Sequence, residues 1–332
     1  MSRTSRIFRH LLLASLAAGL VACGGSGTDD GVTSASVLVQ SSDTAADGLD
    51  FFNAQRMAIG LPELARDPRL DEAAQGHSDY QALNAVVSHY QVEGKPGFTG
   101  VCLGYKAADD RCVPGEPTRL EAAGYVFTHP GSYAYGEVIS KTAGTSGADA
   151  ADALIAAIYH RFVIFEPMFR DAGVGAASAG AMTYFTTNFA TDGLVPVLGK
   201  GNFIVYPRDR QVNVRRSFRS NQERPDPWPC PQDATGKCTG PDPDEVGYPI
   251  SIHADATSVI EVDSFTLRPV GGSSVEVRNL WRAVDPATST RSAAAIVPRL
   301  VLAPNTQYEA RFSGRVDGIA VTNHSWTFTT GP

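Results

Sequence analysis

The chain has 332 residues, 43% of them hydrophobic, and a formal net charge of −7, a composition typical of a folded protein with more than one domain. It is acidic and has no basic stripe, which argues against a nucleic-acid partner and against direct adhesion to anionic lipid head groups. Removal of residues 1–22 would take away three arginines and change the formal charge to −10.

Residues 1–22 have the pattern of a secretory signal peptide. Three arginines precede the apolar run LLLASLAAGLVA, which is too short for an ordinary membrane-spanning helix. The tetrapeptide LVAC, residues 20–23, resembles a bacterial lipobox, and this resemblance implies cleavage before Cys23 and lipidation of that cysteine. The alternative is plain signal-peptide cleavage near Ala22, with Cys23 left as a spare thiol.

Lipidation at Cys23 would attach the protein to a membrane, because several acyl chains give a stable anchor. We therefore expect an exported lipoprotein at the outer membrane or cell surface, and otherwise a secreted or periplasmic protein. Gly24 after the cysteine favours the outer membrane in a Gram-negative cell. Residues 23–47 are mostly small and polar and predict a flexible tether.

Residues 48–195 mix helical and strand-like patterns and form the first predicted domain. Helical periodicity predicts three helices, over residues 49–61, 70–83 and about 149–165. The second of these follows Asp67-Pro68, a cap with proline in the first turn. Alternation over residues 179–190 predicts a strand.

Residues 200–332 are almost wholly strand-like and form the second predicted domain. Tyr308, Ala310 and Phe312 alternate with charged residues, and short strands of this kind are parted by Gly, Pro and Asn turns. The pattern predicts a small β-sandwich. Residues 224–245 form a loop that is too rich in proline for regular structure.

Apart from Cys23, four cysteines fall as two near pairs. In an exported protein this spacing predicts two disulfides, Cys102–Cys112 and Cys230–Cys238, each closing a short loop. The alternative is a four-cysteine zinc site, although neither pair has the two-residue spacing typical of such sites.

Short sequence motifs in the first domain resemble those of a known protein family. In chain order they are Asn53-Ala54-Gln55-Arg56, Gly60-Leu61-Pro62, Leu70 with Ala74 and His77, Ser88-His89, Arg119, Ala123-Gly124-Tyr125, Gly136-Glu137, His160-Arg161, Gly173-Val174-Gly175 and Tyr184-Phe185-Thr186. The ordered set resembles the CAP superfamily of cysteine-rich secretory, insect antigen 5 and plant pathogenesis-related proteins, in its bacterial branch. The resemblance implies an α-β-α sandwich.

The second domain resembles the bacterial Ig-like modules of envelope proteins. The resemblance rests mainly on Leu302-Pro304-Asn305-Thr306-Tyr308. Such modules usually act as spacers between domains or bind ligands, and they seldom catalyse reactions. The expected fold class is therefore α+β, with a CAP-like α-β-α sandwich followed by an all-β Ig-like sandwich.

The CAP resemblance implies a shallow cleft lined by two histidines and two acidic residues. By position the histidines are His89 and His160, and one acid is Glu137. Two imidazoles can hold a divalent metal such as zinc, while a carboxylate can orient one of them, complete the metal shell or accept a proton. The alternative is that each histidine satisfies a buried hydrogen bond and that Glu137 stabilises a turn.

This chain departs from the family pattern at the second acid. The stretch DALIAAIYH, residues 152–160, carries alanines where a glutamate and other polar residues are usual in the family. Val138 follows Glu137 where the family usually has Asn. The sequence shows no clear catalytic nucleophile. It contains no G-x-S-x-G motif, and its paired cysteines are expected to form disulfides.

Three other polar side chains have structural interpretations. His77 falls on the packing face of the second helix, and His253 is expected on a strand surface of the second domain. Arg161 is expected to brace the end of the third helix by pairing with Glu166 or Asp171, or by bonding helix carbonyls.

We expect a non-enzymatic binding module for a small apolar ligand, a glycan or a protein partner in the bacterial envelope. The alternative is a metal-dependent hydrolase of envelope peptides or glycans that uses His89, Glu137 and His160. A third possibility is a structural surface protein whose CAP domain is inert.

Overall fold

The computed structural model describes residues 38–104, 112, 115–230, 233–235, 239, 244–285, 288 and 290–332. The predicted signal peptide, the predicted lipidation site Cys23 and the first part of the tether lie outside the described residues, as does Cys238. Residues 36–332 form one compact unit. Within the described part of the chain, no helix is both long and apolar enough to span a membrane.

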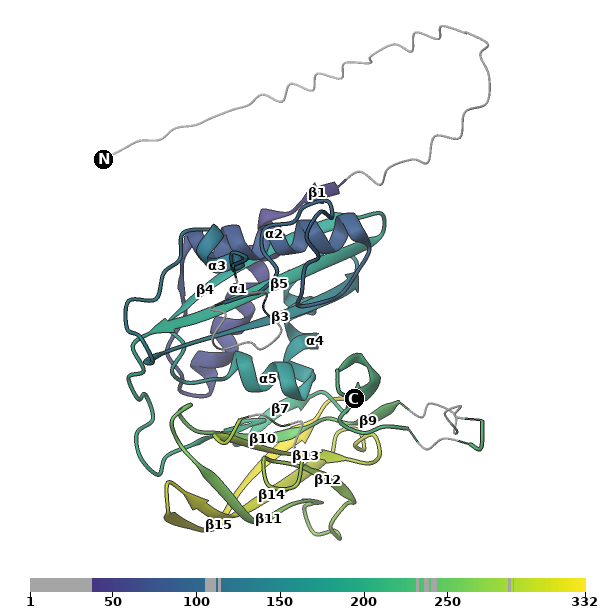
Figure 1. The fold of residues 1–332 in the computed structure, drawn as a ribbon. Helices are drawn as coiled ribbons and strands as arrows, with labels where there is room; N and C mark the ends of the chain where they lie inside the picture. The colour runs from purple at the N-terminus through teal and green to yellow at the C-terminus, as the bar shows by residue number, and fades with distance from the viewer. Residues whose placement is uncertain are drawn as a thin grey trace, which may run out of the picture. The chain divides into compact units, whose positions relative to one another are not determined.

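The first half of this unit is built around one sheet (Figure 1). Its elements are β1 (Leu38–Gln40), α1 (Ser42–Ala58), β2 (Ala65–Arg66), α2 (Pro68–Asn84), α3 (Arg119–Ala122), β3 (Tyr133–Ala143), α4 (Gly147–Ala156), α5 (Ile158–Ile164), β4 (Asp171–Ala179) and β5 (Met182–Asp192). The strands lie in the order β1-β4-β5-β3, with β2 parallel to β4. The hairpin of β4 and β5 and the pairing of β5 with β3 are antiparallel.

Helices cover both faces of this sheet, which confirms the predicted α-β-α sandwich. On one face α2 lies close to the β4 backbone, where Ser78 Oγ donates to the Gly175 carbonyl at 2.9 Å. A side chain at Gly175 would collide with the α2 backbone, so the glycine permits this close approach. Phe52 of α1 packs against Phe185 and Phe189 of β5 in the core of the other face.

The first helix begins earlier than the sequence predicts. Residues 38–47 belong to the predicted tether, but the structure places them in β1 and the start of α1. Thr44 and Ala45 are buried, and Thr44 Oγ1 donates to the Thr145 carbonyl at 2.8 Å. The second helix starts as predicted, with the Asp67 side chain accepting from the N–H of Arg69 and Leu70.

The predicted third helix is two helices, α4 and α5, that meet at Ala157. Ala157 has an extended backbone (φ −75°, ψ 118°), so the hydrogen-bond ladder is interrupted there. Side chains satisfy the backbone groups that the break exposes. Arg161 Nε donates to the Ile155 carbonyl at 2.6 Å, and Glu223 accepts from the N–H of Tyr159.

The second half of the unit contains only strands and one short 3₁₀ turn among its described residues (Figure 1). The strands are β6 (Ile204–Tyr206), β7 (Gln211–Val214), β8 (Ser217–Arg219), β9 (Glu245–Gly247), β10 (Ile250–His253), β11 (Ile260–Pro269), β12 (Val277–Leu280), β13 (Ala293–Pro298), β14 (Gln307–Val316) and β15 (Ile319–Thr330). They form sheets in the orders β12-β13-β10-β6 and β11-β14-β15-β7, with β8 and β9 as a separate pair.

The β-sandwich prediction is confirmed, and its assignment to the Ig-like class stays a prediction. Tyr308, Ala310 and Phe312 alternate as buried residues along β14, as the sequence predicts. Trp326 and Phe328 do the same on β15.

Arg161 joins the two halves of the unit. It is fully buried, and its Nη1 donates to the Pro249 carbonyl at 2.7 Å. Its guanidinium also lies 4.9 Å from the ring centroid of Tyr206 and 4.8 Å from that of Tyr248. The structural role predicted for Arg161 is therefore confirmed. Of the alternative partners, a helix carbonyl is confirmed, since Nε donates to the Ile155 carbonyl at 2.6 Å. The alternative of Glu166 or Asp171 is wrong, because the other end of the guanidinium bonds the Pro249 carbonyl in the β-sandwich.

His253 also lies in this contact and is not on the surface. Its ring is buried, 5.7 Å from the ring centroids of Phe162 and of Phe165. Burial lowers the pKa of His253 to about 3, so the ring is neutral. The surface prediction fails because α5 of the first half covers this strand.

Cysteine pairing agrees with the sequence where it is described. Cys102 and Cys112 form a disulfide with a Cα–Cα distance of 5.5 Å. Cys230 is also disulfide-bonded.

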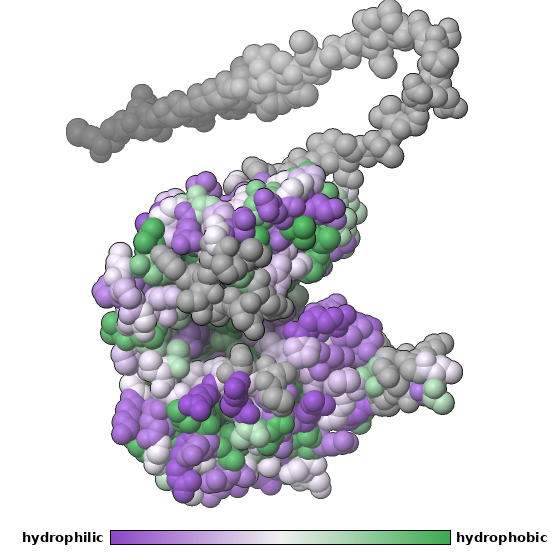
Figure 2. Space-filling model, viewed as in Figure 1, coloured by the Kyte–Doolittle hydropathy of each residue, from purple (hydrophilic) through white to green (hydrophobic). Residues whose placement is uncertain are grey.

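On the face drawn in Figure 2, hydrophobic side chains are interspersed among hydrophilic ones.

Candidate functional site

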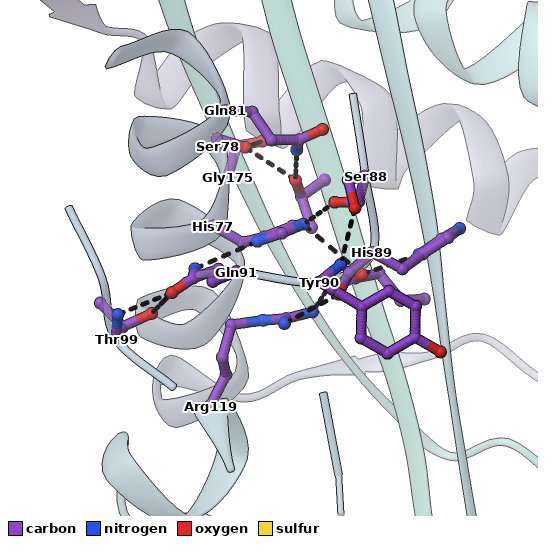
Figure 3. A network of polar contacts seen from close by, with 12 residues as sticks. His77, Ser78, Gln81, Ser88, His89, Tyr90, Gln91, Thr99, Arg119 and Gly175 are labelled. Atoms are coloured by element: carbon purple, nitrogen blue, oxygen red, sulfur yellow. Dashed lines mark hydrogen bonds and ion pairs between the residues drawn. The ribbon is translucent and has the colours of Figure 1, made fainter. Parts of the chain in front are cut away.

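Glu137 is buried at the centre of a polar network. Figure 3 labels three members of this network, His77, His89 and Arg119. The carboxylate lies in the middle of β3, where Oε1 is 2.9 Å from His89 Nδ1 and Oε2 is 2.7 Å from Arg119 Nη2. Arg119 Nη1 donates to the His89 carbonyl at 3.0 Å. Arg119 therefore holds both the carboxylate and the loop that carries His89.

The network keeps Glu137 ionised. Burial alone would raise the pKa of Glu137, but the Arg119 guanidinium and the hydrogen bond from His89 hold it well below its usual range. An ionised carboxylate only accepts hydrogen bonds, so His89 carries its proton on Nδ1 and donates it to Glu137. The other ring nitrogen, Nε2, is then a free acceptor when the ring is neutral.

His77 supports this network from the core of α2. Its ring is fully buried, with Nε2 2.8 Å from the Ser88 carbonyl and Nδ1 3.1 Å from Gln91 Nε2. A carbonyl accepts and an amide nitrogen donates, so Nε2 carries the proton and Nδ1 accepts. Burial lowers the pKa of His77 to about 4, so the ring stays neutral although Glu137 is 3.7 Å away. The predicted packing role of His77 is confirmed.

His89 is the exposed member of the set. Its side chain is 45% exposed, whereas that of Glu137 is 1% exposed. An exposed imidazole backed by a buried carboxylate is oriented for proton transfer, for hydrogen bonding to a ligand or for metal ligation through Nε2.

His160 has a different acidic partner. Its Nδ1 lies 2.6 Å from Oε1 of Glu223, which follows β8 and lies outside the predicted CAP domain. The same carboxylate accepts from the backbone N–H of Tyr159 at 2.8 Å and of His160 at 3.2 Å. Glu223 thus caps α5 and fixes the His160 ring with one fully buried group.

The three predicted cleft residues therefore form two separate pairs. Among the described residues no hydrogen bond or ion pair links His160 to His89 or Glu137. Nor do the described residues include any group of three or more His, Cys, Asp or Glu side chains placed to hold one metal ion. The described contacts thus give no support to a zinc site shared by His89 and His160, and a metal there stays a prediction.

His160 lines a pocket of about 640 Å³. Ala153, Ala156 and Ala157 form part of its wall from α4 and its junction with α5, and β3 supplies a second wall. Five polar side chains of the second half complete it: Arg215, Ser217, Arg219, Gln222 and Glu245. The alanines that replace the polar residues of the family are therefore matched by polar groups from the following strands.

Sequence reasoning missed Glu223 and the arginines of this pocket. Glu223 lies 63 residues after His160 in the chain, at the edge of a Pro-rich loop, and the CAP resemblance does not extend that far. For Arg119, which lies in the Glu137 network, the sequence does contain a signal for its position. Thr118 and Glu121 form a capping box, and α3 begins at Arg119.

Comparison with known proteins agrees with the fold of the first half. The model of the cysteine-rich secretory protein family, CAP, matches residues 49–189. A search of curated proteins found no match.

Among solved structures, the chain is similar to an extracellular protein containing an SCP domain from Bacillus anthracis str. Ames. The identity is 24%, the TM-score is 0.31, and the match covers 44% of this chain and 39% of that one. It is also similar to an outer surface protein from Borrelia burgdorferi, with 11% identity, a TM-score of 0.36, and coverage of 47% of this chain and 98% of that one. The match to the CAP family is thus confined to residues 49–189, where it agrees with the resemblance seen in the sequence.

Proposed function

We propose that this chain is an exported, lipid-anchored envelope protein whose CAP domain is a binding module, with its ligand site in the pocket beside His160. The observation that supports this proposal most strongly is that both halves of the unit contribute side chains to the pocket. They surround His160, whose ring is held by the buried carboxylate of Glu223. A volume of about 640 Å³ is in the range of small-molecule and cofactor sites. Export and anchoring at Cys23 rest on the sequence pattern of residues 1–23.

The charges around the pocket favour a ligand with an acidic group. Lys141, Arg215 and Arg219 line it together with the carboxylate of Glu245. Arg215 also pairs with Asp152 at 2.8 Å, so the cations exceed the nearby carboxylates by one. Apolar groups such as Leu154 share the wall and leave room for the body of a sugar or a short peptide. Of the ligand classes expected from the sequence, an envelope glycan fragment that carries a carboxylate matches this lining most closely.

The serines of the pocket support binding rather than acyl transfer. Ser217 Oγ donates to Glu245 at 2.6 Å, and Ser140 Oγ is buried without a hydrogen-bond partner among the described residues. Neither is bonded to a histidine in the described part of the chain, as a nucleophile paired with its base would be.

The test is a calorimetric titration of residues 36–332 with muramyl dipeptide, a glycan fragment that carries one carboxylate. We expect saturable binding without cleavage, and about tenfold weaker binding by an Arg215→Ala/Arg219→Ala variant. Arg315→Ala removes an exposed arginine of β14 outside the pocket and is the matched control. Equal affinities for the double variant and the control would refute the proposed site.

A second candidate function, a hydrolase, draws on the exposed His89 ring and its buried carboxylate. In this account His89 Nε2 accepts a proton from water or binds a metal such as zinc, and Glu137 orients the ring. Peptide or glycan hydrolysis that is lost in Glu137→Gln, with folding intact, would favour this candidate over the binding module.

A further inference from the structure

A second cavity, of about 290 Å³, borders α5 and is lined in part by aromatic side chains. Tyr135, Tyr159, Phe162 and Phe169 line it. Its volume is at the lower end of the range for ligand sites, so it suits a small molecule rather than a peptide. It shares no lining residue with the pocket beside His160, so an inference about it does not depend on the proposed function.

Glu166 adds a carboxylate to this aromatic lining. Its Oε1 accepts from the N–H of Met168 at 3.1 Å and of Ala256 at 2.9 Å. Among the described residues, no hydrogen bond or ion pair reaches Oε2. That oxygen is also not sealed in the core, unlike buried unpartnered atoms such as Gln81 Oε1. The cavity therefore combines an unpaired carboxylate oxygen with aromatic side chains, the two kinds of group that attract an organic ammonium ion.

Arg224 adds the opposite charge to the lining. Its Nη1 donates to the carbonyls of Asn221 at 2.8 Å and Glu223 at 3.1 Å. Its Nε and Nη2 donate to no described residue, and the side chain is exposed. A purely cationic ligand would meet repulsion from this guanidinium, and a purely anionic ligand would meet repulsion from Glu166. An uncharged lipid would leave both charges without a partner.

We propose that this cavity binds a small zwitterion, with an ammonium group against Glu166 and the aromatic rings and an anionic group against Arg224. The ammonium group gains electrostatic attraction from both the carboxylate and the rings. The anionic group, a phosphate or a carboxylate, takes the guanidinium N–H groups that Arg224 leaves unused. Free phosphocholine and the head group of phosphatidylcholine share this chemistry.

The experiment is a calorimetric titration of residues 36–332 with phosphocholine, choline and 3,3-dimethylbutan-1-ol, the neutral isostere of choline. It is run at about pH 8.5, because burial raises the pKa of Glu166 to about 7 and the carboxylate must be ionised. We expect phosphocholine to bind more tightly than choline, and the alcohol to bind least. Phosphocholine that shows no binding at about 10 mM, or an alcohol that binds as well as choline, would overturn the proposal. Co-sedimentation with phosphatidylcholine vesicles then distinguishes a lipid head group from a soluble ligand.

Variants separate the two ends of the ligand. Glu166→Gln keeps the Oε1 acceptor and should weaken both phosphocholine and choline at least tenfold, whereas Arg224→Gln should weaken phosphocholine alone. Glu261→Gln, an exposed carboxylate of β11 outside the cavity, is the matched control. Phe162→Leu tests the aromatic wall if Glu166→Gln does not fold. Variants that bind phosphocholine as the control does would contradict the assignment.

Discussion

At the scale of single residues, Arg161 illustrates how a charged side chain serves as a core residue. Its guanidinium is fully buried between Tyr206 and Tyr248 and bonds carbonyls on both sides of the contact. Neither Lys nor an apolar residue reproduces a planar group that stacks on rings and donates in several directions.

We therefore expect Arg161→Ala to lower the free energy of unfolding by roughly 3 kcal/mol or more, because it leaves a cavity and unsatisfied carbonyls. Arg161→Lys should recover only part of this loss. Urea denaturation of residues 36–332 measures both, with the exposed Arg315→Ala expected to stay within about 0.5 kcal/mol of wild type. A loss below about 1 kcal/mol in Arg161→Ala would contradict this role.

Glu166 gives the chain a dependence of stability on pH. Burial raises the pKa of Glu166 to about 7, since backbone hydrogen bonds and Arg56 offset that effect only in part and Asp255 adds to it. A carboxyl with a raised pKa stabilises the fold while protonated, and this contribution is lost as pH rises from about 4.5 to 7.

Glu166→Gln removes this titration. Relative to wild type, the variant should gain roughly 2 kcal/mol in unfolding free energy between pH 5 and pH 8. Paired denaturation curves at the two pH values measure the difference. A difference that does not change with pH would mean that Glu166 has an ordinary pKa.

The His89–Glu137 pair shows what single residues allowed us to predict. Both residues were assigned to the cleft by their positions in the family pattern, and in the structure His89 Nδ1 lies 2.9 Å from Glu137 Oε1. His160 was chosen in the same way but contacts Glu223 instead, since a family pattern carries no information about a carboxylate outside the family domain.

At the scale of elements, the division of one predicted helix into α4 and α5 has the largest consequence for the pocket. Continuous helical periodicity from residue 149 to 165 hides the break at Ala157, because each half keeps its own apolar stripe. The groups that stabilise the break are side chains of Arg161 and Glu223, and only the fold brings Glu223 there. Helix existence was thus predictable from local pattern, while the break was not.

Glu223→Ala tests this capping. We expect α5 to lose about 1 to 2 kcal/mol of local stability, because the N–H groups of Tyr159 and His160 lose their acceptor. Hydrogen exchange at these two amides should then accelerate by about tenfold or more. Amides of α2, such as that of Ser78, serve as the internal control. Unchanged exchange at Tyr159 and His160 would exclude Glu223 as the cap.

At the scale of the whole molecule, one hydrophobic core runs through both halves of the unit described here, from Phe52 of α1 to Phe328 of β15. The sequence predicted the two halves and their types, because strand and helix periods differ. It did not predict their contact, because the buried His253 and the arginine that joins them look like surface residues in a linear pattern.

This continuity makes a prediction about cooperativity. All three tryptophans, Trp228, Trp281 and Trp326, lie in the second half, whereas α1 and α2 give most of the helical circular dichroism. In wild type, thermal transitions followed by tryptophan fluorescence and by the helical signal should coincide. In Arg161→Ala they should separate by several degrees. Separate transitions in wild type would mean that the halves unfold independently.

The central claim is that ligand is bound beside His160, in a pocket that His89 and Glu137 do not line. The most direct measurement is the NMR of ¹⁵N-labelled histidine rings in residues 36–332 during titration with muramyl dipeptide. Binding in this pocket predicts that the His160 ring signals shift with saturation while those of His89 stay in place. A joint shift of His89 and His160, as one shared catalytic cleft would give, or no shift of His160, would contradict the account.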